Sequence, residues 1–516
     1  MSAVLVFCAV LTALLATYSL GHYFCAAVFL TSRRHRRSFG FPEDSVAVLI
    51  PARNEGERAM RAINSLLAQD HRGPIEIHLL VKDEHDTAIP LMQKSFPNVD
   101  FSLSTEQLCQ VTTDSERSVF VAYVGVDPKS DKVNWIASRT KAHYTAILDA
   151  DHQAHSQWLR SSICLLQQHK ARIVQGRRQP ISARGFFQLW DSLHQHIGCE
   201  LFNTAFTRLG LNVFFTGTTV VMETELLQSH PFSSCITEDT DFSYDIFLHG
   251  ERIINNPFCG SDEATSPDLY SFLARRRRWA NGHTESFFRH LPSLFQAPIS
   301  RASRLQFLFH GAHYLISLVV FLLHLAIGVV FFAELSTISI IGSLVSALIL
   351  SNWVAETQGT IGRLARLAEL VVIFGWIYPA IVILMNFSQA ALMNDFTRAV
   401  LPIPAFLQVM GLAAFFAPLV ILVVGLAGFK QLGIGSFLVT IITYLLAFYL
   451  DLCGVLLGMV DYFFGRARWR PISREQREPG GADPAKLLPA KGIKDSWRMG
   501  PAFSAARRLL PGVQNR

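Results

Sequence analysis

Apolar residues are concentrated at the two ends of the chain, and a segment of mixed polarity lies between them. Residues 2–31 contain no Asp, Glu, Lys or Arg, and this run is longer than the roughly 20 residues that a helix needs to cross a bilayer. The chain becomes apolar again from residue 305 to residue 463, with candidate spans at 308–334, 336–353, 368–392, 403–428 and 434–462. The pattern predicts an N-terminal transmembrane helix, a mixed-polarity domain and a multi-span region.

The middle segment alternates between strand-like and helix-like patterns. Val46 to Ile50 form a β-rich run, and Met60, Ile63, Leu66 and Leu67 then recur at helical spacing. Further strands are predicted at Ile75 to Val81, at Val119 to Val124, and at Ile147 and Leu148. Strands that alternate with helices indicate an α/β domain with a mainly parallel sheet, which binds its ligands beyond the carboxyl ends of the strands.

Charge sets the expected topology and the domain boundaries. The basic run "SRRHRR" follows the first apolar stretch, and such clusters stay on the cytosolic side of a membrane. We therefore expect an integral, multi-pass protein of the cell (inner) membrane with its central domain in the cytosol. A cytosolic basic tail requires an even number of later spans, so 336–353, the shortest candidate, is expected not to cross. The expected domains are an N-terminal transmembrane helix with its basic flank (1–37), a cytosolic domain (38–300), a multi-span region (301–464) and a disordered tail (465–516).

Polar side chains follow the predicted strands at three places. Arg53 to Glu55 follow the first strand, although these residues could serve only as a helix start. Asp83 and Glu84 follow the second strand, where ordinary loop polarity is the alternative. Asp149 and Asp151 follow the fourth strand, and two carboxylates so close repel each other unless a cation lies between them. Mg²⁺ or Mn²⁺ with phosphate oxygens fits such a pair.

Two further clusters carry charge. "CITEDTDFSYDIFLHG" contains Glu238, Asp239 and Asp241, and a helix start capped by Thr237 is the alternative to a functional role. "RRRRW", residues 275–279, could be a solvated face or a patch for an anionic partner. The carboxylate pair, a further carboxylate that could act as a general base and the arginines with an aromatic residue together suit group transfer from a nucleotide diphosphate.

The ordered set of motifs resembles the membrane-embedded family 2 glycosyltransferases with a GT-A fold, which include cellulose, chitin and hyaluronan synthases and ceramide glucosyltransferase. "PARNE", with Ala52 and Glu55, is similar to the first nucleotide-loop motif of that family, and Asp83 lies where a uracil-contacting Asp is expected. "DAD" resembles the metal motif, with Asp149 and Asp151 as metal ligands. "FFTGT", with Phe215 and Gly217, resembles the acceptor segment. In "TED", Thr237, Glu238 and Asp239, the resemblance makes Asp239 the base. "RRRRW" resembles the Q(Q/R)xRW signature through Arg278, which would pair with the donor diphosphate, and Trp279, which would stack beneath the acceptor sugar.

The resemblance implies an inverting, metal-dependent glycosyltransferase that uses a nucleotide sugar, by expectation a UDP-sugar, and Mg²⁺ or Mn²⁺. Its implied partners are the donor, a glycan or lipid acceptor and the bilayer, and nucleic acid is not among them. A processive β-glycan synthase that exports its product through its own spans is the leading expectation. Transfer of one sugar to a lipid is the alternative that Arg275 favours, because Arg replaces the usual Gln there, and a transporter with a cytosolic binding domain is a third. We also expect Arg276 and Arg277 to face anionic headgroups or solvent.

Overall fold

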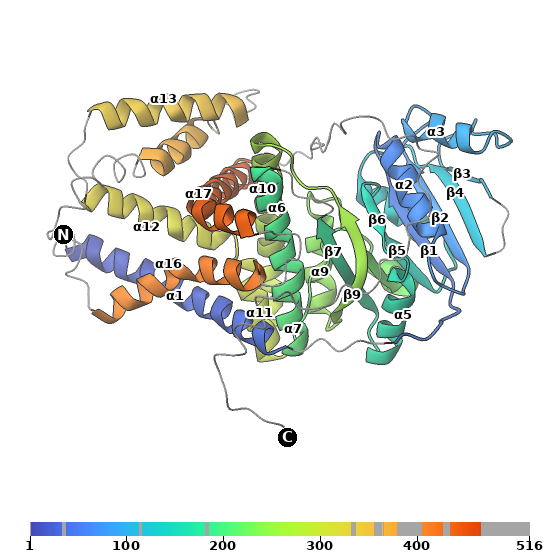
Figure 1. Cartoon of the computed structure of the whole chain (residues 1–516), viewed down its shortest axis with the longest axis horizontal. Coiled ribbons are helices and arrows are strands. Elements are labelled where there is room, and N and C mark those ends of the chain that lie inside the picture. The colour runs from blue at the N-terminus through green and yellow to red at the C-terminus, as the bar shows by residue number, and fades with distance from the viewer. Residues whose placement is uncertain are drawn as a thin grey trace, which may run out of the picture.

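The computed structural model describes residues 2–32, 38–112, 116–180, 185–331, 337–354, 364, 366–378, 405–426 and 434–465. A sheet with its covering helices forms one end of the molecule, and long apolar helices form the other (Figure 1). Helices α6, α7 and α10 lie between these two parts (Figure 1). The basic run at 33–37 and residues 466–516 of the predicted tail lie outside the described residues.

The central sheet has the strand order β3-β4-β2-β1-β5-β8-β7-β9-β6. Its strands are β1 (Val46–Pro51), β2 (Ile75–Val81), β3 (Gln107–Gln110), β4 (Arg117–Tyr123), β5 (Tyr144–Ile147), β6 (His152–Ala154), β7 (Ile173–Pro180), β8 (Val220–Glu223) and β9 (Ile253–Glu263). The strands expected from the hydrophobic pattern are β1, β2, β4 and β5, which pair in parallel. Strands β3, β6 and β8 pair antiparallel with their neighbours. The α/β class is therefore confirmed, but the sheet is mixed rather than mainly parallel.

Both faces of the sheet are buried, and β1 shows why its sequence is apolar throughout. Val46, Val48 and Ile50 pack into the cluster that includes α2 and α5. Ala47 and Leu49 point to the opposite face and join the cluster that includes α4 and α7. Because successive side chains of a strand point to opposite faces, a strand covered on both sides reads as a continuous apolar run.

Further helices cover the sheet or lie between it and the apolar helices. They are α2 (Gly56–Leu67), α3 (Ala88–Ser95), α4 (Lys129–Ala137), α5 (Trp158–His169), α6 (Phe186–His196), the π-helix η1 (Ile197–Phe202), α7 (Asn203–Arg208), α8 (Thr224–Ser229), α9 (Glu238–Leu248), α10 (Leu269–His290) and the 3₁₀ helix η2 (Leu291–Phe295). The helix expected from Met60 to Leu67 is α2, and the whole "RRRRW" motif lies within α10.

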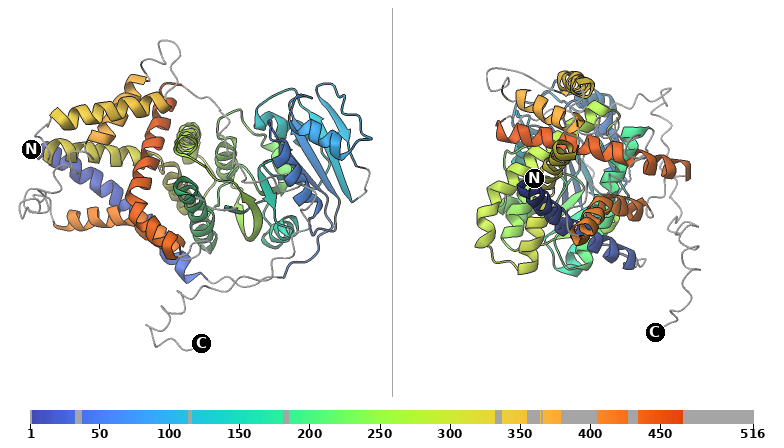
Figure 2. Two further views of the ribbon diagram at one scale, coloured as in Figure 1. Left: turned by 45° about the horizontal axis from the view of Figure 1, so that its top comes forward. Right: turned by 90° about the vertical axis from the view of Figure 1, so that its left-hand side faces the viewer.

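The apolar helices are α1 (Ser2–Thr31), α11 (Arg301–Gly311), α12 (Leu315–Phe331), α13 (Thr337–Val354), α16 (Ala405–Leu426) and α17 (Ile434–Phe463). Within the described residues, two helical segments are long and apolar enough to cross a membrane, Val6–Thr31 and Leu446–Phe463. The bent pair α11 and α12, with an angle of 55° between them, would be a third. The C-terminal half of the expected span 368–392 lies outside the described residues. Helix α17 runs crosswise to α1 and α12 (Figure 2).

Candidate active site

A cavity of about 2050 Å³ extends from the carboxyl ends of β1 and β5 to the apolar helices α1, α12, α16 and α17. Ordinary small-molecule pockets measure roughly 300–1,000 Å³, so this cavity has room for more than one substrate. Its lining includes every site residue expected from the sequence except Asp83, namely Ala52, Glu55, Asp149, Asp151, Phe215, Gly217, Thr237, Glu238, Asp239, Arg278 and Trp279. The fold therefore brings together motifs that are distant in sequence.

The carboxylate pair lies just beyond β5. Asp149 and Asp151, together with His152, offer ligand atoms that all lie within 4.8 Å of one another. The backbone amide of Asp149 donates to Thr218 Oγ1 at 2.8 Å, which fixes the start of this loop. A half-buried and a buried carboxylate at this spacing fit a divalent cation, and His152 adds a ligand that the sequence analysis did not include.

A lysine that the sequence analysis missed lies among these carboxylates. Lys129 Nζ donates to Asp149 Oδ1 at 2.5 Å and to the carbonyl of Gly217 at 2.5 Å. It also lies 3.8 Å from Glu238 Oε1. Burial lowers the pKa of Lys129, but Asp149 and Glu238 outweigh this effect and raise it. The positive charge of Lys129 therefore lies between the metal motif and the "TED" motif and balances the carboxylates of both.

Gly217 lies directly against the expected base. Its φ of +86° is a backbone conformation that is strained for residues with a side chain. A Cβ atom built there would lie 3.0 Å from Asp239 Oδ2. Asp239 follows the first residue of α9, and its Oδ1 accepts from the amide of Thr240 at 2.8 Å. A glycine at this position leaves one oxygen of Asp239 open to the cavity.

The sequence left open that Thr237 only caps a helix. Thr237 is the N-cap residue of α9, but its side chain makes no capping hydrogen bond. Its side chain instead packs against Gly282 of α10, where an added Cβ would lie 2.5 Å from the threonine Cγ2 and Oγ1 atoms. The close approach of Thr237 and Gly282 holds the start of α9 against α10.

Burial shifts the pKa of both acids of the "TED" motif. Burial raises the pKa of Glu238 to about 7; Lys129 opposes this effect and Asp239 reinforces it. Burial also raises the pKa of Asp239, although the hydrogen bond from Thr240 and the charge of Lys129 both lower it. A carboxylate with a raised pKa is a stronger base and suits proton abstraction near neutral pH.

The first arginines of the "RRRRW" motif are buried and paired with acids. Arg275 Nη1 donates to Asp191 Oδ2 at 2.6 Å. Arg276 Nη2 lies 3.3 Å from Asp191 Oδ1, and Arg276 Nε donates to Asp451 of α17. Arg275 and Arg276 are 2% and 1% exposed, respectively. These two residues hold α10 against α6 and α17.

Arg277 is paired in the same way. Its Nη2 donates to Asp461 Oδ1 at 2.7 Å and to Glu369 Oε1 at 2.5 Å. The expectation that Arg276 and Arg277 face headgroups or solvent is therefore wrong. In the sequence, a charge run whose hydrogen-bonded acidic partners are more than 80 residues away cannot be distinguished from a surface patch.

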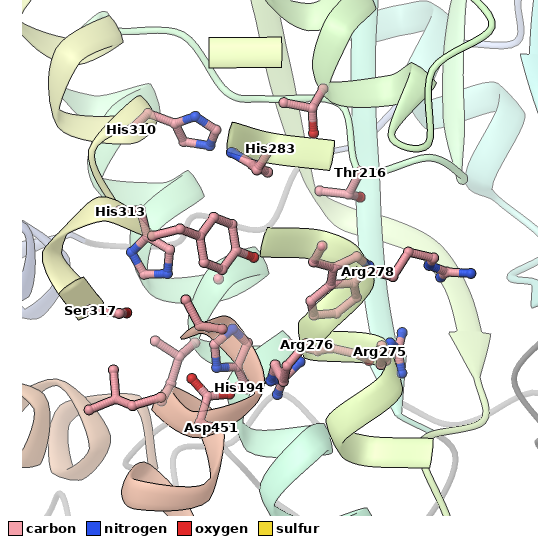
Figure 3. Close-up of a pocket in the computed structure, with 18 of the residues that line it drawn as sticks. His194, Thr216, Arg275, Arg276, Arg278, His283, His310, His313, Ser317 and Asp451 are labelled. Carbon is pink, nitrogen blue, oxygen red and sulfur yellow. Dashed lines mark hydrogen bonds and ion pairs between the residues drawn. The ribbon is translucent and has the colours of Figure 1, made fainter. Parts of the chain in front are cut away.

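Arg278 differs from its neighbours. In the part of the chain that the structure describes, its guanidinium forms no ion pair, and its side chain lines the cavity (Figure 3). Burial and Arg275 lower the pKa of Arg278, whereas the carboxylates of Glu238 and Asp239 raise it. The next residue, Trp279, has the guanidinium carbon of Arg275 over its ring at 4.7 Å from the centroid. Of the four arginines, Arg278 is the one without an acidic partner among the described residues, so its charge remains available to an anionic ligand.

The loop after β1 is tied to the loop after β2. Asn54 has a φ of 57°, a left-handed conformation that Asn tolerates. Its backbone N–H donates to Asp86 Oδ2 at 2.8 Å. Glu55 is the N-cap residue of α2 but makes no capping hydrogen bond. Ala52 is 2% exposed, and its carbonyl accepts from Lys132 Nζ at 2.7 Å. Asp83 lies at the same edge of the sheet, where its Oδ1 accepts from the amide of His85, but it is not part of the cavity wall.

A second group that the sequence analysis missed supports the floor of the site. Arg178 of β7 donates to Glu263 Oε2 at 2.6 Å and to the carbonyl of Thr216 at 3.0 Å. His152 Nε2 lies 3.4 Å from the same carboxylate oxygen of Glu263. His152 directly follows the metal motif and could have been noticed, but Arg178 and Glu263 belong to strands that the pattern did not predict.

Histidines line the cavity where it approaches the membrane helices. His310 lies near the end of α11, His313 lies in the break between α11 and α12, and His283 projects from α10 on the facing side (Figure 3). The hydroxyl of Tyr244 is 2.9 Å from His310 Nδ1, and the ring of His310 stacks on Phe214. Burial lowers the pKa of His283 to about 3, so this part of the cavity offers neutral hydrogen-bonding groups.

The chain resembles several known proteins at low identity. No curated protein matches the chain. A mannosyltransferase from Pyrobaculum calidifontis, PcManGT, solved with GDP-Man and Mn²⁺, is similar in structure, with 16% identity, a TM-score of 0.48, and coverage of 73% of this chain and 99% of that chain. S. aureus TarS 1-349, also solved with UDP and with UDP-GlcNAc, matches with 13% identity, a TM-score of 0.36, and coverage of 67% and 92%. Residues 144–387 match the model of Glycosyl transferase family group 2. This segment, just under half of the chain, carries Asp149, Asp239 and Arg278 and is therefore similar to the family 2 glycosyltransferases.

Proposed function

We propose that this protein transfers one sugar from a nucleotide-diphosphate sugar to a lipid acceptor at the membrane surface. The observation that carries the proposal is the continuity of the cavity, which joins the carboxylates beyond β5 to apolar side chains of α12, α16 and α17. The far part of its wall includes Leu323, Leu412, Phe415, Ile421, Phe448 and Leu452. Such a wall suits a hydrocarbon chain, because apolar surface is stabilised by removal from water.

The proposed reaction is a single inverting displacement. Asp239 accepts the proton of an acceptor hydroxyl while that oxygen forms a bond to the anomeric carbon, and the bond from this carbon to the diphosphate oxygen breaks. Arg278 binds the departing diphosphate, for which a planar guanidinium provides bidentate donors. Gly217 leaves room for the acceptor oxygen beside Asp239.

The residues present fit the implied metal. Asp149, Asp151 and His152 offer two carboxylates and a ring nitrogen within 4.8 Å of one another, and these three would hold Mg²⁺ or Mn²⁺. The ion when bound would neutralise charge on the diphosphate. Lys129 makes a direct ion pair with Asp149, so we expect this lysine to move toward Glu238 or toward the nucleotide when the metal binds.

The neutral histidines support an uncharged polar head on the lipid. His283, His310 and His313 line the same cavity as the carboxylates and the apolar wall (Figure 3). A neutral imidazole has one donor and one acceptor nitrogen, which suits hydroxyl or amide groups better than a phosphate.

The test is to incubate the full-length protein, in membranes or detergent, with a panel of UDP- and GDP-sugars and a lipid extract, and then to determine the size of the product. We expect a lipid that carries one sugar, formed only with a divalent metal and lost in Asp151→Asn. Full activity in excess chelator would contradict the metal assignment, and a long polysaccharide would contradict the acceptor assignment.

A processive β-glycan synthase is the second candidate. Aromatic residues also line the cavity, among them Trp279, Trp376 and Tyr444, and aromatic faces suit the apolar faces of sugar rings. This candidate predicts a product whose length grows with time at a fixed amount of acceptor, whereas the lipid proposal predicts a product of fixed size.

A further inference from the structure

We propose that His230, Asp245 and His249 form a second metal site, selective for Zn²⁺ and separate from the carboxylate pair. A ring nitrogen of each histidine and a carboxylate oxygen of Asp245 lie within 4.8 Å of one another. His230 Nδ1 is 2.6 Å from Asp245 Oδ2, and His249 Nδ1 is 3.5 Å from Asp245 Oδ1. A nitrogen of each imidazole therefore lies near the same carboxylate; His249 Nδ1 also lies 2.8 Å from the backbone carbonyl of Asp245, a contact that metal binding would replace.

The local structure explains this convergence. Asp245 and His249 are four residues apart on α9, a spacing that places two side chains on the same face of a helix. The same i, i+4 spacing presents two ligands to zinc in helical metalloprotease motifs. His230 is the C-cap residue of the preceding helix α8 and supplies the third ligand from a separate element.

The electrostatics of the cluster favour a cation. In the part of the chain that the structure describes, the ion-pair partners of Asp245 are the two histidines, and no Lys or Arg neutralises it. Asp245 and His249 lie at the C-terminal end of α9, where the helix dipole is negative and stabilises positive charge. A carboxylate placed there without a cation is unfavourable.

The ligand set indicates which ion binds. Two imidazoles and one carboxylate, completed by water, are a common coordination of Zn²⁺, whereas Mg²⁺ and Mn²⁺ prefer oxygen ligands. The side chains of His230, Asp245 and His249 are 20%, 36% and 61% exposed, so an ion can enter from solvent. The bound ion would connect His230, at the start of loop 230–237, to the C-terminal end of α9. Both the end of this loop, at Thr237, and the start of α9, at Glu238 and Asp239, belong to the "TED" motif.

The test measures zinc bound to full-length protein from which metals have been removed, with excess Mn²⁺ present to occupy the Asp149 site. We expect wild type to bind one more equivalent of Zn²⁺ than His230→Gln, His249→Gln or Asp245→Asn. Zinc should also raise the Tm of wild type and leave the Tm of these variants unchanged.

His143→Gln is the matched control. His143 pairs with Asp44 at 2.9 Å and its side chain is 56% exposed, but this pair has no third ligand within the described residues. The control should bind as much Zn²⁺ as wild type. Equal zinc content in wild type and in the three cluster variants would overturn the proposal and leave the cluster as hydrogen-bonded side chains only. An equal loss in His143→Gln would also overturn it, because binding would then depend on surface histidines in general. Asp245→Asn preserves side-chain volume, so it decides the question if either histidine variant fails to fold.

Discussion

Asp239 and Glu238 are adjacent in the chain, but their surroundings assign them different tasks. Asp239 lies against Gly217 and faces the space where an acceptor would bind. Glu238 lies 3.8 Å from Lys129 and helps to hold that ammonium group near the metal motif. We therefore assign proton transfer to Asp239 and electrostatic positioning to Glu238.

Replacing the base should separate binding from chemistry. Asp239→Asn keeps the size of the side chain and removes its ability to accept a proton. We expect turnover to fall by at least about 10²-fold, the lower end of general-base contributions, while the affinity for the nucleotide sugar is retained. Steady-state kinetics and nucleotide titration measure the two effects. A variant that loses donor affinity to the same extent as turnover would show that Asp239 acts in donor binding instead.

The pKa of Glu238 predicts a pH dependence of stability. Burial raises this pKa from 4.5 to about 7, so the folded state holds the proton more tightly than the unfolded state. The stabilisation is fully present below about pH 4.5 and is lost as the pH rises through about 7. In metal-free protein we expect the Tm of Glu238→Gln, which cannot ionise, to rise relative to wild type between about pH 5 and about pH 8. A Tm difference that stays constant over this range would contradict the assignment.

At the scale of elements, α10 joins the part that contains the sheet to the apolar helices. The arginines of its one basic run have different surroundings, because successive side chains of a helix point in different directions. Arg276 and Arg277 pair with acids of α17, and Arg277 also pairs with Glu369. Arg278 lines the cavity and has no ion-pair partner among the described residues. The ion pairs fix the position of α10 and thereby the position of Arg278.

Breaking one of these ion pairs should destabilise the protein, whereas changing Arg278 should impair catalysis. Arg276→Met leaves Asp451 without its partner, and removal of one member of a buried pair typically costs about 3–5 kcal/mol. The double variant with Asp451→Asn should recover part of this loss.

Arg278→Lys keeps a charge without the bidentate fork, so we expect weaker donor binding and slower turnover with little change in Tm. Thermal unfolding and UDP titration of all three variants separate these outcomes; equal losses of UDP affinity in Arg276→Met and Arg278→Lys would mean that the run acts as an undifferentiated basic patch.

The sequence predicted local elements well and long-range partners poorly. The strands β1, β2, β4 and β5 were predicted because each is rich in apolar residues and lies just before polar residues or a loop. Strand β8 is only four residues long and lies within the apolar stretch that begins at Leu211, so its boundaries have no local signal. Lys129 and Arg178 were missed because only the fold brings them to carboxylates 20 or more residues away. Asp149 and Asp239 were selected because they belong to short motifs that resemble those of a known family, and both line the cavity.

For the molecule as a whole, the open question is which apolar segments cross the bilayer. The sequence alone favoured 336–353 as the one that does not cross. In the structure, α13, which corresponds to that segment, lies roughly parallel to α12, whereas α17 runs crosswise to it (Figures 1 and 2). The apolar window of α17 is 61% buried inside the protein, compared with 22% for α1, and α17 carries Asp451 and Asp461, which pair with α10. These features suit a helix that packs along the catalytic part better than one that faces lipid.

We therefore expect 336–353 to cross and 434–462 to lie along the inner face of the membrane. Four spans then still follow the catalytic domain, because 308–334, 336–353, 368–392 and 403–428 make an even number, so the tail remains in the cytosol. Reporter fusions at residues 358, 395 and 430 distinguish the two topologies. If 434–462 does not cross, residues 358 and 430 are cytosolic and residue 395 lies outside. If 336–353 does not cross, each of these three positions lies on the opposite side, whereas a fusion at the C-terminus is cytosolic in both cases. A C-terminal fusion that is active only outside would contradict both topologies, because the number of spans would then be odd.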